Sequence, residues 1–204
     1  MVIGKWNKSV WLSYAGVGVS CAGIFLAIVM HEYAYACICL IIAGICDMLD
    51  GFVARLGKNR SVSDRQFGIE LDSVADVVDF VALPIAIVCA MDMKELYELV
   101  PVIVFAVCGV ARLAYYNTVA LKNDKPVQYY HGLPVTFTAM IFPICFLAFM
   151  YFIPSVAREL LLISMTIIGF LNILDIHVVK PKPKIYGLFI VLAIIVSILL
   201  VAAL

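Results

Sequence analysis

Seven long apolar stretches alternate with short polar connections along this chain. A helix that crosses a lipid bilayer needs about 20 predominantly apolar residues, and each stretch is close to that length. The windows lie near Val10–Met30, Ala34–Arg55, Gly68–Met91, Leu96–Leu121, Leu133–Phe152, Ser155–Ile176 and Ile185–Leu204. The pattern predicts an all-α, polytopic membrane bundle, with residues 1–204 forming a single integral membrane domain.

Composition supports a bilayer surrounding. Of the 204 residues, 65% are hydrophobic and only 14% are charged, whereas soluble domains have roughly 25% charged residues. A globule of this size has too much surface for its volume to hide so many apolar side chains. We therefore expect the lipid bilayer as the main partner of the chain and no nucleic acid.

The distribution of Lys and Arg predicts the orientation. Cytoplasmic connections of membrane proteins carry an excess of these residues. Four connections that fall on one side of the membrane hold most of them, and the opposite side holds Lys94 and Arg158. The amino terminus and the 55–68 connection are therefore expected on the cytoplasmic face of the plasma membrane.

Four aspartates stand where two apolar stretches meet this connection. Asp47 and Asp50 end the second stretch, and Asp72 and Asp76 begin the third. Residues three or four apart share one face of a helix, so each pair is expected to point the same way. Small residues leave the same faces open, namely Gly51, Ala54 and Gly68.

Four carboxylates at bilayer depth are expected to bind cations. Each buried charge costs on the order of 2.5–3.5 kcal/mol, and crowded carboxylates also repel one another. Divalent cations with oxygen ligands, such as Mg²⁺ or Mn²⁺, offset both costs and leave positions open for phosphate. Arg55 can add a bidentate phosphate contact.

Two other interpretations of the aspartates remain open on physical grounds. They could be helix caps or an interfacial rim, or they could line a cation channel or carrier. Arg55 and the glycines favour phosphate binding, because a pore needs no phosphate clamp.

Eight of these positions resemble a known signature. The run Asp47-x2-Asp50-Gly51-x2-Ala54-Arg55, followed by Gly68-x3-Asp72-x3-Asp76, resembles that of the CDP-alcohol phosphatidyltransferase family. One departure is the length of the connection, which has twelve residues (56–67) where the family usually has about eight. The resemblance implies a dimeric bundle of six core transmembrane helices, to which this chain adds a seventh, with the site near the cytoplasmic surface.

The same resemblance implies roles for these residues. Asp47, Asp50 and Asp72 are expected to ligate two divalent cations, Mg²⁺ or Mn²⁺. Asp76 is expected to be both a metal neighbour and the catalytic general base. The remaining four residues are expected to admit or bind the CDP group and its phosphates, namely Gly51, Ala54, Arg55 and Gly68.

Three further segments resemble the phosphatidylserine synthase branch of the family: GIELDSVADVVDF, Arg112–Asn117 and Tyr130–Thr136. That branch implies transfer of a phosphatidyl group from CDP-diacylglycerol to L-serine with release of CMP. Other acceptors remain open, such as glycerol phosphate, inositol phosphate or another amino alcohol, and a cation carrier is a more distant alternative. Residues expected to bind the acceptor are Asp79, Arg112, Asn117 and His131.

Asp79 departs from that branch. The branch tends to have Ser-Phe-Gly-Val-Ala-Pro where this chain has Asp79-Phe80-Val81-Ala82-Leu83-Pro84. Asp79 is expected either to contact a cationic acceptor amine or to pair with Arg112.

Overall fold

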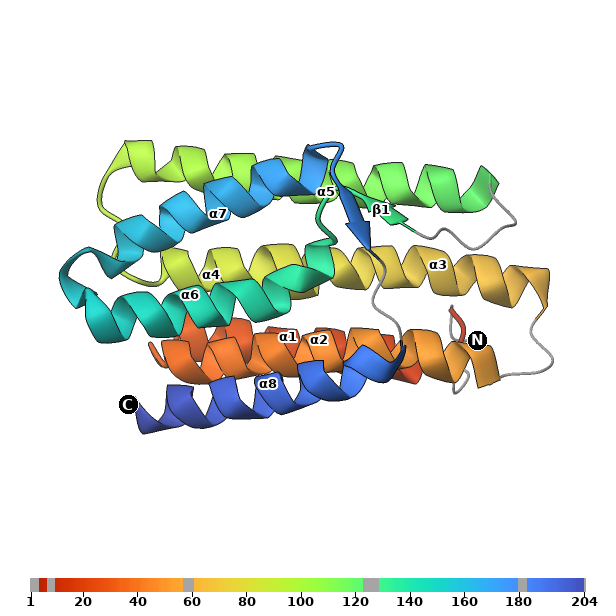
Figure 1. The fold of residues 1–204 in the computed structure, drawn as a ribbon, viewed down its shortest axis with the longest axis horizontal. Coiled ribbons are helices and arrows are strands. Elements are labelled where there is room, and N and C mark those ends of the chain that lie inside the picture. Colours follow the sequence, from red (N-terminus) through yellow and green to blue (C-terminus); the bar gives the residue numbers. More distant parts are fainter. Residues whose placement is uncertain (1–3, 7–9, 57–60, 123–128, 180–182, 204) are drawn as a thin grey trace.

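Long helices aligned along one direction make up most of the chain (Figure 1). The computed structural model describes all residues except 1–3, 7–9, 57–60, 123–128, 180–182 and 204. The α-helices are α1 Trp11–Ile28, α2 Tyr33–Leu56, α3 Val62–Asp76, α4 Leu83–Cys89, α5 Leu99–Lys122, α6 Thr138–Phe152, α7 Ala157–Ile173 and α8 Pro183–Ala202. The 3₁₀ turns are η2 Leu96–Glu98, η3 Val135–Phe137 and η4 Pro154–Val156.

Six helices in the described part of the chain are long and apolar enough to cross a membrane. They are Trp11–Ile28, Tyr33–Gly51, Leu96–Thr118, Val135–Phe152, Pro154–Ile173 and Ile185–Ala202. The predicted all-α membrane bundle is therefore confirmed. The third predicted window, 68–91, differs because it is not one continuous α-helix.

A π-helix divides this third window. The six-residue π-helix η1, Val77–Ala82, joins α3 to α4, and the three elements follow one line in Figure 1. Pro84 stands in the first turn of α4, where the missing N–H of proline costs no helical hydrogen bond. Asp79 and Phe80 in η1 are both buried. The π-helix, whose turn is wider than that of an α-helix, thus directly follows α3, which carries Asp72 and Asp76.

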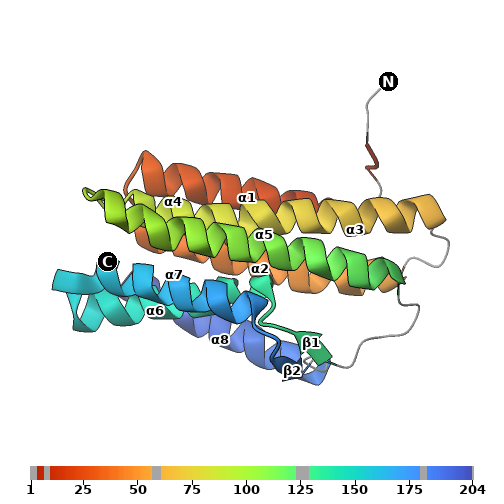
Figure 2. The ribbon, with the colours of Figure 1, turned by 90° about the horizontal axis from the view of Figure 1, so that it is seen from above.

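Helix α2 lies between two groups of helices. Figure 2 shows α6, α7 and α8 together on one side and α1, α3, α4 and α5 on the other, and α2 contacts α1, α4, α6 and α8. Small residues allow α2 and α6 to approach closely. A Cβ added at Gly44 would lie only 2.5 Å from the Cβ of Ala139. Small residues are common where membrane helices approach closely. The largest side chains of the core include Leu40, Phe80, Leu83, Phe105, Phe142 and Met165.

An ion pair between Glu98 and Arg158 joins two parts of the bundle at the end opposite the four aspartates. Glu98 is buried, and its Oε1 lies 2.9 Å from Nη2 of Arg158. Its Oε2 accepts hydrogen bonds from the backbone N–H groups of Lys94 and Glu95. Arg158 also donates to the carbonyl oxygen of Asp92 at 2.6 Å. The start of α7 is thereby tied to the connection between α4 and α5.

A two-stranded antiparallel ribbon lies at the other end. Strands β1, Tyr129–His131, and β2, His177–Val179, pair with His131 opposite His177. Backbone hydrogen bonds continue this pairing from Gly132 N–H to the Ile176 carbonyl, at 2.9 Å. Gly132 has φ +77°, and a Cβ there would lie 2.3 Å from the carbonyl oxygen of Asn172. Only glycine fits this close turn, which places β1 beside the helix ends.

Part of the long connection between α2 and α3 belongs to α3. Helix α3 begins at Val62, and Ser61 and Asp64 form a reciprocal capping box at its start. Lys5, from the segment before α1, contacts Asp64 Oδ1 at 2.5 Å and Ser63 Oγ at 2.9 Å. Four residues of the connection, 57–60, lie outside the described part of the chain.

Candidate active site

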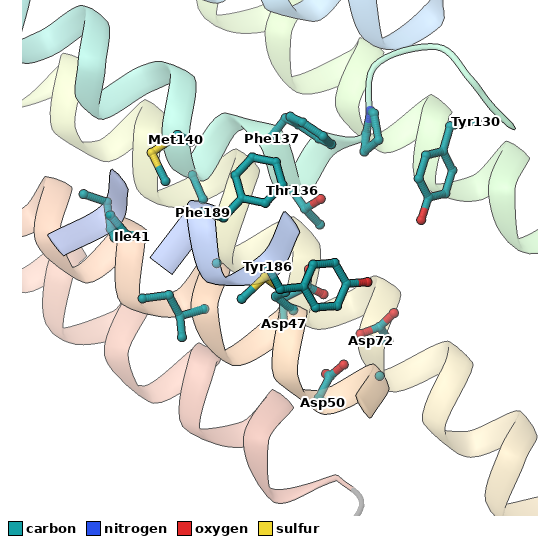
Figure 3. Close-up of a pocket in the computed structure, with 17 residues that line it drawn as sticks. Ile41, Asp47, Asp50, Asp72, Tyr130, Thr136, Phe137, Met140, Tyr186 and Phe189 are labelled. Atoms are coloured by element: carbon teal, nitrogen blue, oxygen red, sulfur yellow. The ribbon is translucent and has the colours of Figure 1, made fainter. Parts of the chain in front are cut away.

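Three carboxylates meet where α2 ends and α3 begins. One oxygen from each of Asp47, Asp50 and Asp72 lies within 4.8 Å of the others. Figure 3 shows the three side chains gathered at one end of a pocket. The structure therefore brings together three of the four aspartates that the sequence singled out.

The pocket is polar at one end and apolar at the other. Its volume is about 520 Å³. The polar end has the three carboxylates together with Gly51, Tyr130 and Tyr186, whereas Ile41, Ile45, Phe137, Met140, Phe189 and Ala193 are among the apolar lining residues. The walls come from α2, η3, α6 and α8, with Asp72 of α3 and Tyr130 of β1 at the polar end, so a ligand with a charged head and a lipid tail fits this arrangement.

Asp76 lies one helical turn beyond Asp72 and is more deeply placed. It is 8% exposed and does not belong to the three-carboxylate group. A metal-ligating or general-base role of Asp76 stays a prediction.

Ser13 is a site residue that lies outside the sequence motif. Its hydroxyl, buried in α1, donates a hydrogen bond of 2.8 Å to Oδ2 of Asp50. Ser13, Gly16, Ser20 and Gly23 are all buried on one face of α1. This spacing of small residues within the first apolar stretch was the available sequence signal.

Asp79 faces α1. Its side chain is 3% exposed, and a Cβ added at Gly16 would lie 2.8 Å from its Oδ2. Within the described residues its Oδ1 has no hydrogen-bond partner, and no salt bridge joins it to Arg112. The structure thus provides no support for the expected pairing of Asp79 with Arg112.

Arg112 and Asn117 connect α5 to the site. The guanidinium carbon of Arg112 lies 4.9 Å from the ring centroid of Tyr116. Arg112 is 7% exposed, and its Nε has no hydrogen-bond partner within the described chain. Oδ1 of Asn117 accepts a hydrogen bond of 2.8 Å from Ser73, which stands between Asp72 and Asp76. Both residues that were predicted to bind the acceptor alcohol therefore lie beside α3, the helix that carries Asp72 and Asp76.

Tyr130 brings the ribbon to the pocket. Its ring lies 5.5 Å, centroid to centroid, from that of Tyr116, and it lines the polar end. Burial, followed by the neighbouring Tyr116, raises the pKa of Tyr130 to about 12. The phenol therefore keeps its proton at neutral pH and can donate a hydrogen bond to a ligand.

The other predicted residues fall in different places. Gly51 lines the pocket, and a Cβ there would meet none of the described residues within 4 Å. Gly68 is half-buried in α3. His131 is outside the pocket lining, with its Nδ1 2.6 Å from Asp175. Ala54 and Arg55 belong to α2, but their side chains lie outside the described residues.

The three-carboxylate group fits a divalent cation. Hard cations bind carboxylate oxygens, and three such oxygens converge here from two helices. The hydrogen bond from Ser13 holds one oxygen of Asp50, an outer contact of the kind that orients metal-ligating carboxylates.

Comparisons with known proteins identify relatives of the chain. A family model described as CDP-alcohol phosphatidyltransferase matches residues 10–204. The CDP-diacylglycerol--serine O-phosphatidyltransferase of Methanocaldococcus jannaschii is 34% identical over 162 residues, which cover 79% of this chain and 70% of that protein.

Two further relatives match over shorter regions. The Saccharomyces cerevisiae protein of the same name is 43% identical over 104 residues, or 48% of this chain and 36% of that protein. The archaetidylserine synthase of Methanothermobacter thermautotrophicus is 31% identical over 137 residues, or 66% of this chain and 55% of that protein. The match to the yeast protein thus spans about a third of its length.

Proposed function

The chain belongs to the CDP-alcohol phosphatidyltransferase family, as the motif in its sequence predicts, and we propose that it transfers the phosphatidyl group of CDP-diacylglycerol to L-serine. The products are phosphatidylserine and CMP. The observation that carries this proposal is the three-carboxylate group at the polar end of a pocket whose other end is apolar. The names of the relatives support serine as the acceptor.

The residues that would hold the cations are Asp47, Asp50 and Asp72, with Asp76 beside them. Two divalent cations, Mg²⁺ or Mn²⁺, would neutralise the charge of the diphosphate and of the leaving CMP. Gly51 is proposed to leave space for the nucleotide, because it lines the pocket and, among the described residues, a Cβ there would have no neighbour within 4 Å. Ala54, Arg55 and Gly68 are proposed to complete the CDP and phosphate contacts.

Asp76 is proposed as the general base. The serine hydroxyl oxygen forms a bond to the phosphorus that carries diacylglycerol, and the bond from this phosphorus to the CMP oxygen breaks. The bonding electron pair leaves with CMP, and the hydroxyl proton passes to the Asp76 carboxylate. A positioned carboxylate is needed because a serine hydroxyl is barely ionised at neutral pH.

Arg112 and Asn117 are proposed to bind the acceptor. Arg112 is buried, positively charged and without a partner for its Nε in the described chain, which suits the carboxylate of serine. Asn117 is fixed to Ser73 between the two aspartates of α3. Asp79 is proposed to contact the amine of the acceptor. Because its side chain lies against Gly16 of α1, this contact is tested separately.

The membrane placement extends this proposal. We place the carboxylate end at the cytoplasmic face of the plasma membrane, where nucleotide and serine arrive from water while acyl chains remain in lipid. The lysines and arginines of the sequence support this orientation. A homodimer is proposed from the family resemblance.

Release of CMP from CDP-diacylglycerol tests the function directly. The purified chain is assayed with Mg²⁺ or Mn²⁺ against serine, glycerol phosphate, inositol phosphate and other amino alcohols. Turnover with serine alone is the expected result. Turnover with a different acceptor would replace serine in the proposal, and no nucleotide release with any acceptor would favour a cation carrier.

A further inference from the structure

Two histidines stand opposite each other on the outer face of the β1–β2 ribbon. His131 pairs directly with His177, and their ring centroids are 5.0 Å apart. Both strands alternate between exposed and half-buried positions, so the histidines share one face while Tyr130 turns inward to the pocket. Opposed side chains of an antiparallel pair are close enough to bind one ligand together.

A carboxylate orients one of these imidazoles. Asp175 stands two residues before His177, and its Oδ1 lies 2.6 Å from Nδ1 of His131. A histidine that ligates a metal usually gives its other ring N–H to a carboxylate, which fixes the tautomer. With Nδ1 engaged in this way, Nε2 of His131 carries the available lone pair. The proton-accepting partner that metal-binding histidines require is therefore already in place.

The accessibility of the three residues agrees with a binding role. The side chains of His131 and Asp175 are 45% and 77% exposed, and His177 is also exposed. A structural buried pair would be closed to ions, whereas this face is open. Imidazole prefers Zn²⁺, Ni²⁺ or Cu²⁺, while the three-carboxylate group suits Mg²⁺ or Mn²⁺. The two sites therefore differ in ligand chemistry.

We infer that His131 and His177 form a second metal site, which binds a divalent transition metal ion through two imidazoles, with Asp175 orienting His131. A bound ion would link β1 to β2 one residue away from Tyr130. The ion would therefore stiffen the part of the ribbon that forms the pocket wall. This site does not depend on the identity of the acceptor.

Ni²⁺ is the probe for the test, because imidazole ligands suit it whereas carboxylate ligands suit Mg²⁺. The full chain, freed of any polyhistidine tag, is kept in detergent with excess Mg²⁺, and Ni²⁺ binding is measured by calorimetry. One equivalent is expected in the wild type. His177→Ala should weaken binding at least tenfold, and Asp175→Asn should weaken it about 10- to 100-fold while keeping both imidazoles.

Two controls separate this site from others. His31→Ala removes an exposed histidine that contacts only Tyr33 among the hydrogen bonds of the described chain, and it should leave Ni²⁺ binding unchanged. Asp47→Asn alters the carboxylate group and should also leave it unchanged. Equal affinity in wild type, His177→Ala and Asp175→Asn would overturn the inference, and so would loss of the equivalent in Asp47→Asn.

Discussion

The hydroxyl of Ser13 in α1 donates a hydrogen bond of 2.8 Å to Oδ2 of Asp50 in α2. This contact fixes one of the three converging carboxylates from a helix that carries no part of the family motif. Ser13 is itself buried, so the contact lies inside the helix bundle. The first helix therefore contributes to the geometry of the candidate metal centre.

Ser13→Ala should weaken metal binding. A hydrogen bond to a charged group is worth about 1.5–3 kcal/mol, so the Mg²⁺ concentration that supports half-maximal CMP release is expected to rise about tenfold or more. Ser164→Ala is the matched control, because the Ser164 hydroxyl bonds to the Leu161 carbonyl within α7 and lies outside the pocket lining. Identical Mg²⁺ dependence in wild type and Ser13→Ala would contradict the role of this contact.

Asp76→Asn should abolish turnover because an amide cannot accept the serine proton. Binding of a cytidine nucleotide should remain measurable, since the three-carboxylate group does not include Asp76. CMP release and nucleotide binding are measured on the same preparation. A variant that retains the wild-type rate would remove Asp76 as the base.

Gly44→Ala should destabilise the contact between α2 and α6. The added methyl group would lie 2.5 Å from the Cβ of Ala139, and overpacking of this kind costs about 1–3 kcal/mol. Gly18→Ala is the control, because its methyl group would meet none of the described residues within 4 Å and replacing a helical glycine favours the helix by up to about 1 kcal/mol. Thermal unfolding in detergent should rank Gly44→Ala below the wild type and Gly18→Ala at or above it.

Acid should release the contact between Lys5 and Asp64. The hydrogen bond from Lys5, followed by those from Ser61, lowers the pKa of Asp64 from 3.8 to about 2. Because the folded-state pKa is the lower one, the carboxylate stabilises the fold above about pH 4, and this contribution is lost as the pH falls toward 2. Carbon NMR titration of Asp64 measures this directly.

Lys5→Met is the corresponding variant. It should move the midpoint of Asp64 upward toward 3.8, because it removes the strongest hydrogen bond to the carboxylate. An unchanged midpoint would show that Lys5 does not hold Asp64 in solution.

Glu98→Ala should lower the thermal stability of the bundle while leaving catalysis intact. It removes the ion pair with Arg158 and the oxygen that accepts from two backbone N–H groups, at the end of the molecule opposite the carboxylates. Glu159→Ala is the control, because Glu159 also pairs with Arg158 but is more exposed. Equal unfolding temperatures for the two variants would contradict this account.

The sequence predicted the membrane helices and the shared face of Asp47 and Asp50 because both depend on local periodicity, whereas the approach of Asp72 was expected from the single connection between the two helices and from the family resemblance. Helix length follows from apolar runs, and aspartates three residues apart must share a face. The contact from Ser13 could not be predicted in this way, because it depends on how α1 packs against α2. The same holds for His131, whose direction is set by pairing with β2, 46 positions along the chain.

The π-helix between Asp76 and Leu83 was also beyond the sequence pattern. Local hydrophobicity does not distinguish i+4 from i+5 hydrogen bonding, since the choice depends on which side chains the neighbouring helices accept. Asp79 and Phe80 are buried together in this turn, and a regular α-helical spacing would have turned the residues on its two sides differently.

For protein engineering, this turn separates parts of the third helical run that respond differently to a change of chain length. Each residue advances an α-helix by about 100°, so deleting one residue from 73–75 would turn Asp72 by roughly that angle relative to the apolar half of the run. The π-helix Val77–Ala82 bonds five residues apart instead of four, so the loss of one residue there can be absorbed by a return to α-helical bonding. A single-codon deletion is therefore expected to be tolerated better inside the π-helix than one turn before it.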